Sequence, residues 1–490
     1  MFFQNLLAKK SVDQVQSEAG NKELKRTLGP LNLVSLGVGC VIGAGIFVMT
    51  GKAAADHAGP AIVLSFILAG FACVLAALCY AELASALPVS GSAYTYTYVT
   101  LGEVFAWIMG WLLVLEYGLS ASTVAVGWSG YVVSFFRDFG IIIPDSLSSP
   151  FFNLSKATGE IIITNHVNLP TIIIVLLLSI LLAVGVKESA NFNNVIVAIK
   201  LSVIIAFIAI GSFYIHPDNW VPFIPDYIPK VTEHGEGKYG FAGILRASSI
   251  IFFAYVGFEA VSTAAQEAKN PQRDMPIGIL GSLIICTILY ILVSGVLTGI
   301  VSYKELSVAD PIAVAVDKVG LGWFSVLIKI GAITGLTSVM LVLLYGQVRI
   351  FYVMSHDGLL PGIFSKTHPK FKTPHINSII VGVIVALVSS LTPIDVLGDM
   401  VSLGTLLAFV MVCFSVLYLR YKRPDLVRPF RCPLVPYVPI LGIILCLYLV
   451  SSMPFATFML IKWWLLFGIL IYLFYGRKHS SLAKIANKTA

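Results

Sequence analysis

Continuous apolar runs of helical length restrict the fold of this chain more than any other feature. An α-helix that spans a bilayer needs about 20 predominantly apolar residues. Because 58% of the 490 residues are hydrophobic and only 12% are charged, against roughly 45–50% and 25% in soluble domains, we predict an all-α integral membrane protein. Short alternating strands, as in a membrane barrel, are not indicated. The runs predict twelve transmembrane helices, at approximately 31–52, 60–86, 101–135, 167–186, 191–214, 241–265, 276–300, 322–354, 376–391, 398–419, 434–452 and 455–475.

The positive charges of the loops predict how these helices are oriented. Two of the 32 lysines and arginines, Lys200 and Lys329, lie within predicted spans. With the N-terminus inside, 21 of the others fall on the cytoplasmic side and nine on the external side. The positive-inside rule then places both termini in the cytoplasm of a multi-pass plasma-membrane protein. The net charge of +7 reflects this topology and contact with the lipid bilayer, as in the basic segment RYKRPDLVRPFR (420–431). We expect no nucleic-acid partner.

No predicted soluble domain interrupts the membrane segments, which argues against a large aqueous enzyme site and favours a carrier, a channel or a receptor. The chain has no G-x-x-x-x-G-K-[ST] phosphate loop, so ATP is not the expected energy source. We therefore predict a protein that is not an enzyme, uses no cofactor and binds no metal. A channel should carry polar or charged rings along a pore, whereas the glycines of this chain favour a carrier.

Glycines interrupt the first predicted helix. The segment GVGCVIGAGIF (37–47) holds four glycines, each costing about 1 kcal/mol relative to alanine inside a helix. Close helix packing accounts for the first two, but Ile42–Gly45 is predicted to be unwound, which is tolerated at mid-membrane only beside a protein cavity. The N–H groups of Ala44 and Gly45 would then bind a carboxylate, and carbonyls near Ile42 would bind an ammonium group.

A second interruption is predicted in the sixth span. If the first ten spans form two five-helix repeats of opposite orientation, span six is the partner of span one and should be broken at the same depth. It contains Gly257 near its middle, with Glu259 beside it. A charged residue at this depth is expected to face the protein interior. Two facing breaks would form a site that suits the zwitterionic end of an amino acid.

Four ordered stretches resemble the signatures of a known superfamily. They are GVGCVIGAGIF (37–47), YAELASALPVSGSAYTY (80–96), EAKNPQRDMPIGI (267–279) and YVMSHDGLLP (352–361). The chain is similar to the amino acid, polyamine and organocation transporters, in particular to bacterial members of the cationic amino acid transporter family. The resemblance implies a 5+5 inverted-repeat fold with broken helices 1 and 6. Its regions would be a cytoplasmic N-terminal segment (1–30), a first five-helix repeat (31–214), a second inverted repeat (241–419), helices 11 and 12 (434–475) and a cytoplasmic tail (476–490).

The resemblance also implies a substrate site. The substrate backbone would lie between the two breaks, with the side chain of Phe253 closing the pocket toward the outside. Glu116 of span three would hold an amino group directly or through water, and Leu343 of span eight would face the pocket. The expected substrate-binding residues are Ile42, Gly43, Ala44, Gly45, Glu116, Phe253, Ala254, Val256, Glu259 and Leu343.

Lys200 is predicted to couple transport to protons. It lies roughly 12 Å inside span five at about 1.5 Å per residue, and it matches the lysine that replaces sodium in proton-coupled relatives. Burial favours an uncharged amine, so gain and loss of a proton would make and break a bridge between spans one and eight. The predicted function is import of an L-amino acid by proton symport with alternating access. An exchanger, a sodium-coupled symporter and a transporter-derived amino acid sensor are the alternatives.

The sequence leaves the substrate open. The charges of Glu116 and Glu259 suit a cationic amino acid, whereas the bulk of Leu343, where animal cationic carriers have a smaller side chain, favours a small neutral one. A free amino acid is expected in either case, and a small accessory membrane subunit on the last two spans is neither required nor excluded. Glu82 is assigned to a cytoplasmic gate or loop bracket, and Arg273 and Asp274 are expected to pair in a solvated loop.

Overall fold

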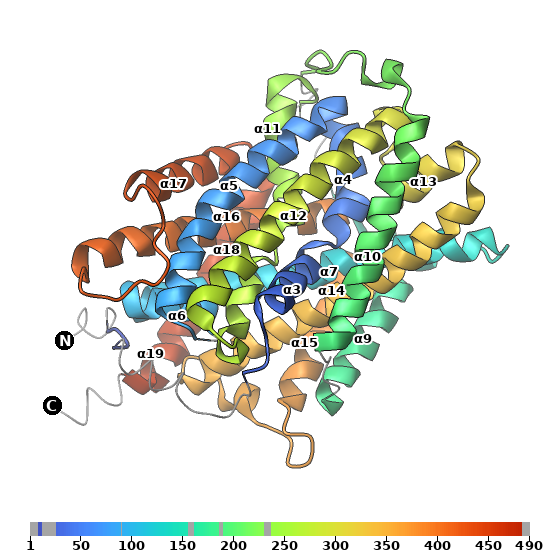
Figure 1. The fold of residues 1–490 in the computed structure, drawn as a ribbon. Helices are drawn as coiled ribbons and strands as arrows, with labels where there is room; N and C mark the ends of the chain where they lie inside the picture. The colour runs from blue at the N-terminus through green and yellow to red at the C-terminus, as the bar shows by residue number, and fades with distance from the viewer. Residues whose placement is uncertain are drawn as a thin grey trace.

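The computed structural model describes residues 8–11, 26–89, 91–154, 161–185, 190–229 and 237–482. Figure 1 shows a bundle of long, mostly tilted helices joined by short loops. Most of the predicted N-terminal segment and of the C-terminal tail lies outside the described residues. The long helices are α5 (Ile62–Ala86), α7 (Glu103–Asp138), α10 (Ala190–Gly211), α12 (Pro271–Ile300), α14 (Gly322–His356), α16 (Ile394–Lys422) and α18 (Phe455–Ile471).

Shorter elements complete the described chain. The other helices are α3 (Pro30–Val41), α4 (Thr50–Ala53), α6 (Ser92–Thr100), α8 (Asp145–Ser148), α9 (Leu169–Val184), α11 (Gly240–Ile251), α13 (Pro311–Lys318), α15 (His375–Leu391), α17 (Tyr437–Val450) and α19 (Arg477–His479). Segments of π-helix are η1 (Gly45–Met49), η2 (Ala54–Ala58) and η10 (Tyr472–Gly476). Segments of 3₁₀-helix are η3 (Gly59–Ala61), η4 (Ser212–Tyr214), η5 (Pro217–Trp220), η6 (Phe252–Tyr255), η7 (Glu259–Glu267), η8 (Tyr303–Glu305) and η9 (Gly362–Ser365).

Length and composition support a multi-pass membrane protein. Among the described residues, eight helical segments are long and apolar enough to cross a membrane, and four shorter apolar helices accompany them. The central segment Gly240–Glu267 is 83% buried in its most apolar window, whereas Phe455–His479 at the edge is 22% buried. Apolar side chains on such outer helices face the surroundings because lipid, not water, is the expected solvent.

Helices far apart in the sequence pack in pairs. Helix α5 packs along α12, α7 along α14, and α9 along α15. In Figure 1, α3 lies beside α12 near the middle of the bundle, whereas α17 lies at the left edge. Helix α3 packs along α12 and α11 packs against α5, and these two helices lead into the predicted interruptions.

Both predicted interruptions are present. Helix α3 ends at Val41, its C-cap Ile42 is extended (ψ 91°), and helical structure resumes as the π-helix η1 at Gly45. Helix α11 continues as η6 only to Tyr255 and is followed by Val256, whose backbone is not helical (φ −57°, ψ 130°). Gly257 then adopts a φ of +120°, which is open to glycine and strained for residues with a side chain.

The structure departs from the sequence analysis in three places. A short antiparallel ladder, β1 (Phe152–Leu154) with β2 (Ile161–Ile163), adds strands to the chain that we expected to be all α. The short helices α6 and α13 lie between expected spans. The expected pairing of Arg273 with Asp274 is wrong, because α12 begins at Pro271 and the Asp274 carboxylate accepts a hydrogen bond from the Asn270 backbone N–H (3.1 Å).

Both ends of the described chain meet at one side of the bundle, at Glu103. The Glu103 N–H donates to the Ala8 carbonyl (2.9 Å), and its carboxylate accepts from the hydroxyls of Tyr472 (2.9 Å) and Ser480. Nearby, Lys10 forms a buried ion pair with Asp357 at the end of α14 (2.7 Å). The N-terminal and C-terminal segments therefore lie on the same side of the protein.

Candidate functional site

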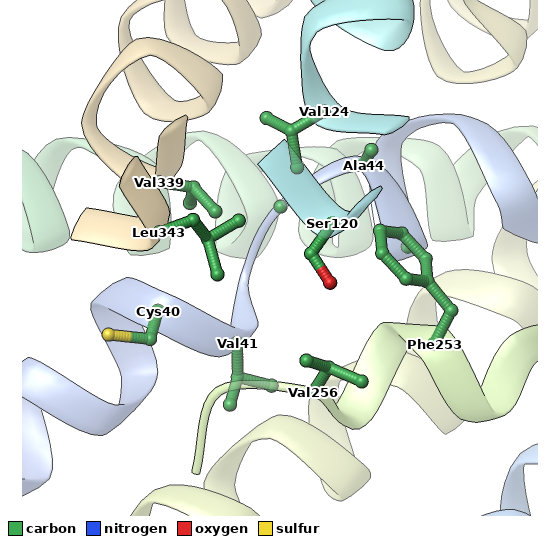
Figure 2. A pocket seen from close by; sticks show the side chains of 11 residues that line it. Cys40, Val41, Ala44, Ser120, Val124, Phe253, Val256, Val339 and Leu343 are labelled. Atoms are coloured by element: carbon green, nitrogen blue, oxygen red, sulfur yellow. The ribbon is translucent and has the colours of Figure 1, made fainter. Parts of the chain in front are cut away.

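A small cavity lies between the two interruptions (Figure 2). Its volume is about 10 Å³, room for about one water molecule, so this conformation is closed around the site. In Figure 2, the ring of Phe253 and the hydroxyl of Ser120 point into the same space, with Leu343 facing them from α14. The lining residues are Cys40, Val41, Gly43, Ala44, Gly45, Ser120, Val124, Phe253, Val256, Val339 and Leu343.

Unbonded peptide groups face this cavity. Within the described chain, the backbone N–H groups of Gly43, Ala44 and Gly45 donate no hydrogen bond. The carbonyl of Val256 accepts none. The buried hydroxyl of Ser120 is also without a partner. Buried polar groups are normally hydrogen-bonded, so this set provides donors for a carboxylate at one end and acceptors for an ammonium group at the other.

Side chains satisfy the remaining peptide groups at the breaks. The hydroxyl of Tyr290 on α12 lies 2.7 Å from the Val41 carbonyl and 2.8 Å from the Ala254 carbonyl, so it joins the two broken segments. Ser402 on α16 accepts a hydrogen bond from the Phe253 N–H (3.1 Å). Sequence reasoning missed Ser120, Tyr290 and Ser402, since nothing in their local sequence distinguishes them from packing residues.

Lys200 lies behind the cavity rather than in it. Its side chain is fully buried, and its ammonium group donates to the carbonyls of Gly39 (2.9 Å) and Ile42 (3.4 Å) at the end of α3. A cation is favourable there because the C-terminal end of a helix is negative. The alkyl chain of Lys200 passes Gly335 of α14, where a Cβ would lie 3.1 Å from its Cγ. The side chain thus fills the space between α3 and α14.

The two predicted carboxylates do not line the cavity either. Both oxygens of Glu259 accept from the Gly257 N–H (2.9 and 3.1 Å), so Glu259 caps its own broken segment. Glu116 is fully buried and faces Glu259 and Thr405. Neither of its oxygens has a hydrogen-bond partner among the described residues. These carboxylates form a layer adjacent to the site.

Of the ten substrate-binding residues predicted from the sequence, some line the cavity and the others lie next to it. Six of them line the cavity: Gly43, Ala44, Gly45, Phe253, Val256 and Leu343. The carbonyls of Ile42 and Ala254 are engaged by Lys200 and Tyr290, and Glu116 and Glu259 lie beside the cavity. None of the described side chains lining the cavity is charged.

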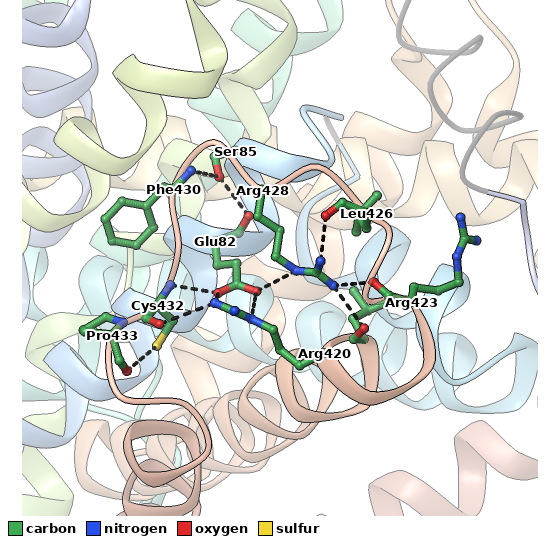
Figure 3. Close-up of polar contacts among 10 residues, drawn as sticks. Glu82, Ser85, Arg420, Arg423, Leu426, Arg428, Phe430, Cys432 and Pro433 are labelled. Carbon is green, nitrogen blue, oxygen red and sulfur yellow. Dashed lines mark hydrogen bonds and ion pairs between the residues drawn. The ribbon is translucent and has the colours of Figure 1, made fainter.

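Glu82, near the end of α5, forms a bracket with the segment that follows α16 (Figure 3). Its carboxylate accepts from Arg420 of α16 (2.9 and 2.8 Å), from Arg428 (3.1 Å) and from the Cys432 N–H (2.8 Å). Burial lowers the pKa of Arg428, and a contact with the thiol of Cys79 lowers the pKa of Cys432. The network fixes the segment after α16 onto the end of α5.

Comparison with known proteins places this chain in a family. The sequence pattern described as amino acid permease matches residues 28–475. The chain belongs to the amino acid permease family. This confirms the resemblance to the amino acid, polyamine and organocation transporters, and the permease is a transport protein, not an enzyme.

Relatives of known function differ in what they carry. The permease is 46% identical to the branched-chain amino acid permease of Bacillus subtilis, over 98% of this chain and 99% of the relative. It is 45% identical to the methylthioribose transporter of the same organism, over 98% and 100%. It is 38% identical to the vacuolar cationic amino acid transporter 4 of Arabidopsis thaliana, over 86% and 68%. Close similarity therefore extends to carriers with chemically different substrates.

Proposed function

We propose that this permease imports a neutral, apolar L-amino acid across the plasma membrane by proton symport with alternating access. The observation that carries the proposal is the set of unbonded peptide groups in an apolar cavity. The free N–H groups of Gly43–Gly45 would bind the carboxylate, as helix N-termini bind anions. The Val256 carbonyl and the Ser120 hydroxyl would accept from the ammonium group.

The lining favours a neutral side chain. Apart from the peptide groups, Ser120 and the thiol of Cys40, the described lining is hydrocarbon, with Phe253 and Leu343 as its bulkiest members. A charged substrate side chain would lose hydration here without gaining an ion pair. The similarity to a branched-chain amino acid permease supports the same choice over a cationic substrate.

The twelve-helix inverted repeat is part of the proposal. If spans one to five and six to ten are repeats, each helix has an equivalent five positions later. The packed pairs α5 with α12, α7 with α14 and α9 with α15 are such equivalents, and the breaks that meet at Gly45 and Ala254 belong to spans one and six. Pairing of equivalent elements around a central site is what an inverted repeat produces. Both termini would be cytoplasmic.

Proton coupling is proposed to act through Lys200. When protonated, Lys200 of α10 holds the end of α3 through the carbonyls of Gly39 and Ile42, while its alkyl chain passes Gly335 of α14. Loss of the proton weakens both hydrogen bonds and frees the first half of span one to move. One charge crossing 100 mV yields about 2.3 kcal/mol, enough for roughly a fiftyfold concentration ratio at 1.4 kcal/mol per tenfold.

The test is uptake into proteoliposomes that contain the purified permease. We expect an inward proton gradient to drive accumulation of labelled leucine or alanine without sodium, and lysine to compete poorly. Lys200→Met should abolish the response to the gradient but retain exchange of internal for external substrate. Lys366→Met, which removes an exposed lysine far from the breaks, is the matched control.

Other outcomes identify the alternatives. Equal uptake driven by sodium without a pH gradient would show a sodium symporter. Transport that requires internal substrate and ignores both gradients would show an exchanger. Binding without transport would show a sensor, and a Lys200→Met variant that still accumulates substrate with the proton gradient would disprove the role of Lys200.

A further inference from the structure

A second, larger concavity lies away from the candidate site, at the beginning of α12. Its volume is about 650 Å³, within the range of about 300–1,000 Å³ typical of pockets for small organic ligands. One wall is formed by the first turns of α12 and the residues before it, and the other by the segment at 429–430. We call it the α12 groove. Its lining residues are Asn270, Gln272, Arg273, Pro276, Ile277, Leu280, Gly281, Pro429 and Phe430.

The wall opposite α12 is held in place by the Glu82 network. The Phe430 N–H donates to the hydroxyl of Ser85 (3.3 Å), and the Cys432 N–H donates to Glu82 (2.8 Å). Figure 3 shows this segment running past the end of α5, with Phe430 on one side of Glu82. Since α5 packs along α12, the segment at 429–430 is fixed to a helix that contacts the opposite wall. The groove is therefore a formed site and not a gap beside a loose loop.

The groove has a polar end and an apolar end. Asn270, Gln272 and Arg273 lie where α12 begins, and Ile277, Leu280 and Gly281 lie one to three turns further into the membrane segment. Ile277 is 40% exposed and Ile284, two turns further along α12, is 52% exposed. The apolar end thus continues onto the outer, lipid-facing surface of α12. The groove therefore combines a polar end that suits a lipid headgroup with an apolar end that suits an acyl chain.

The polar end carries unpaired positive charge. Arg273 is exposed, as are Lys269 and Arg431 beside the lining residues. None of these three cations forms an ion pair within the described ranges. The nearest acid in sequence, Asp274, is engaged by the Asn270 N–H. The loop charges predict that this side faces the cytoplasm, where the leaflet carries anionic lipids.

We propose that the α12 groove binds one anionic phospholipid of the cytoplasmic leaflet. The phosphate lies against Arg273, and an acyl chain runs over Ile277 and Leu280 onto the outer face of α12. A guanidinium group suits a phosphate because it presents several donors in a fixed plane. The bound lipid joins α12 to the segment that Glu82 holds on α5. The inference goes beyond the proposed transport function and relies on it only for the orientation in the membrane.

The experiment is native mass spectrometry of the full-length permease in detergent, titrated with phosphatidylglycerol or phosphatidylcholine. We expect one phosphatidylglycerol to be retained much more strongly than phosphatidylcholine. Arg273→Gln should weaken its retention about fivefold, the effect of about 1 kcal/mol per basic residue near an anionic lipid. Lys366→Gln removes an exposed positive charge elsewhere on the same side and should leave retention unchanged.

A photoactivatable phosphatidylglycerol should label peptides that contain residues 270–281. Inorganic phosphate and glycerophosphoglycerol, which have no acyl chains, should neither be retained nor displace the lipid. The proposal is overturned if phosphatidylcholine is retained equally, if the two variants behave alike, or if either soluble phosphate displaces the lipid, since that last result would identify a site for a free anion. Because Arg273 is exposed and unpaired, its replacement does not threaten folding.

Discussion

Gly45→Ala tests the close approach of the two broken segments. A Cβ on Gly45 would lie 2.3 Å from the Cβ and 2.4 Å from the Cα of Ala254, whereas ordinary contact begins at 3.4 Å. The obstacle is backbone, so the segments must separate by about 1 Å. That separation would also stretch the hydrogen bonds by which Tyr290 joins Val41 and Ala254. Overpacking of this kind costs about 1–3 kcal/mol, equivalent to roughly 5- to 150-fold in an equilibrium at 1.4 kcal/mol per tenfold.

We therefore expect Gly45→Ala to lower the initial rate of labelled leucine uptake, measured per reconstituted molecule, by roughly 5- to 150-fold. We also expect it to lower the melting temperature of the protein in detergent. Gly43→Ala is the matched control, because its Cβ would lie 3.3 Å from a methyl group of Val339, a side chain that can yield a few tenths of an ångström. Adding Ala254→Gly to Gly45→Ala should not restore transport, since the Ala254 Cα remains. Equal rates for Gly45→Ala and Gly43→Ala would refute the reasoning.

Three further predictions concern substrate range and stability. Leu343→Ser should widen the cavity and let arginine compete with leucine for uptake; unchanged competition profiles would contradict its placement. Arg246 of α11 forms a buried bidentate pair with Asp399 of α16 (2.8 and 2.6 Å), so Arg246→Ala should destabilise the protein by about 3–5 kcal/mol by leaving a buried charge unpaired. The double variant Arg246→Ala/Asp399→Ala should melt at a higher temperature than Arg246→Ala, and a lower one would exclude this explanation. Asp310 lies outside the membrane segments, and burial raises the pKa of its carboxyl group more than Ser134 and Lys329 lower it. The folded protein therefore binds the proton of this carboxyl group more tightly than the unfolded chain does. Its stability decreases as the pH rises from the unfolded pKa through the folded pKa. Asp310→Asn should raise the melting temperature near neutral pH and have little effect in acid, and an equal gain at both would show that ionisation is not the cause.

Much of the fold could be predicted because its determinants are local. Apolar runs of membrane length identify most long helices, and a glycine cluster weakens a helix wherever it occurs, so the break near Gly43 was predictable from its own segment. The break near Gly257 was predicted from the expected repeat, because a single glycine is a weak local signal. The short helices α6 and α13 and the strands β1 and β2 were not, because they lie between spans, where hydropathy carries little information. The start of α12 at Pro271 was missed for a similar reason.

The site was predictable only in outline. Its backbone donors at Gly43–Gly45 followed from the break itself, and motif resemblance drew attention to Phe253 and Leu343. The positions of Glu116 and Glu259 beside the cavity, not within its lining, could not be read from the chain, because each depends on which neighbours it meets. The charge of a residue predicts that it needs a partner at mid-membrane depth but does not identify that partner.

The amino-acid sequence is enough to identify a membrane permease with helices interrupted at two glycine-containing positions. Hydropathy and helix propensity act within a single segment, so they are readable along the chain. Which peptide groups stay unbonded depends on how the helices pack. Tyr290, Ser402 and Lys200 satisfy the other groups from helices that are distant in sequence, and what remains after those contacts is the candidate binding site. A hydrogen bond between distant segments forms only once packing has brought them together.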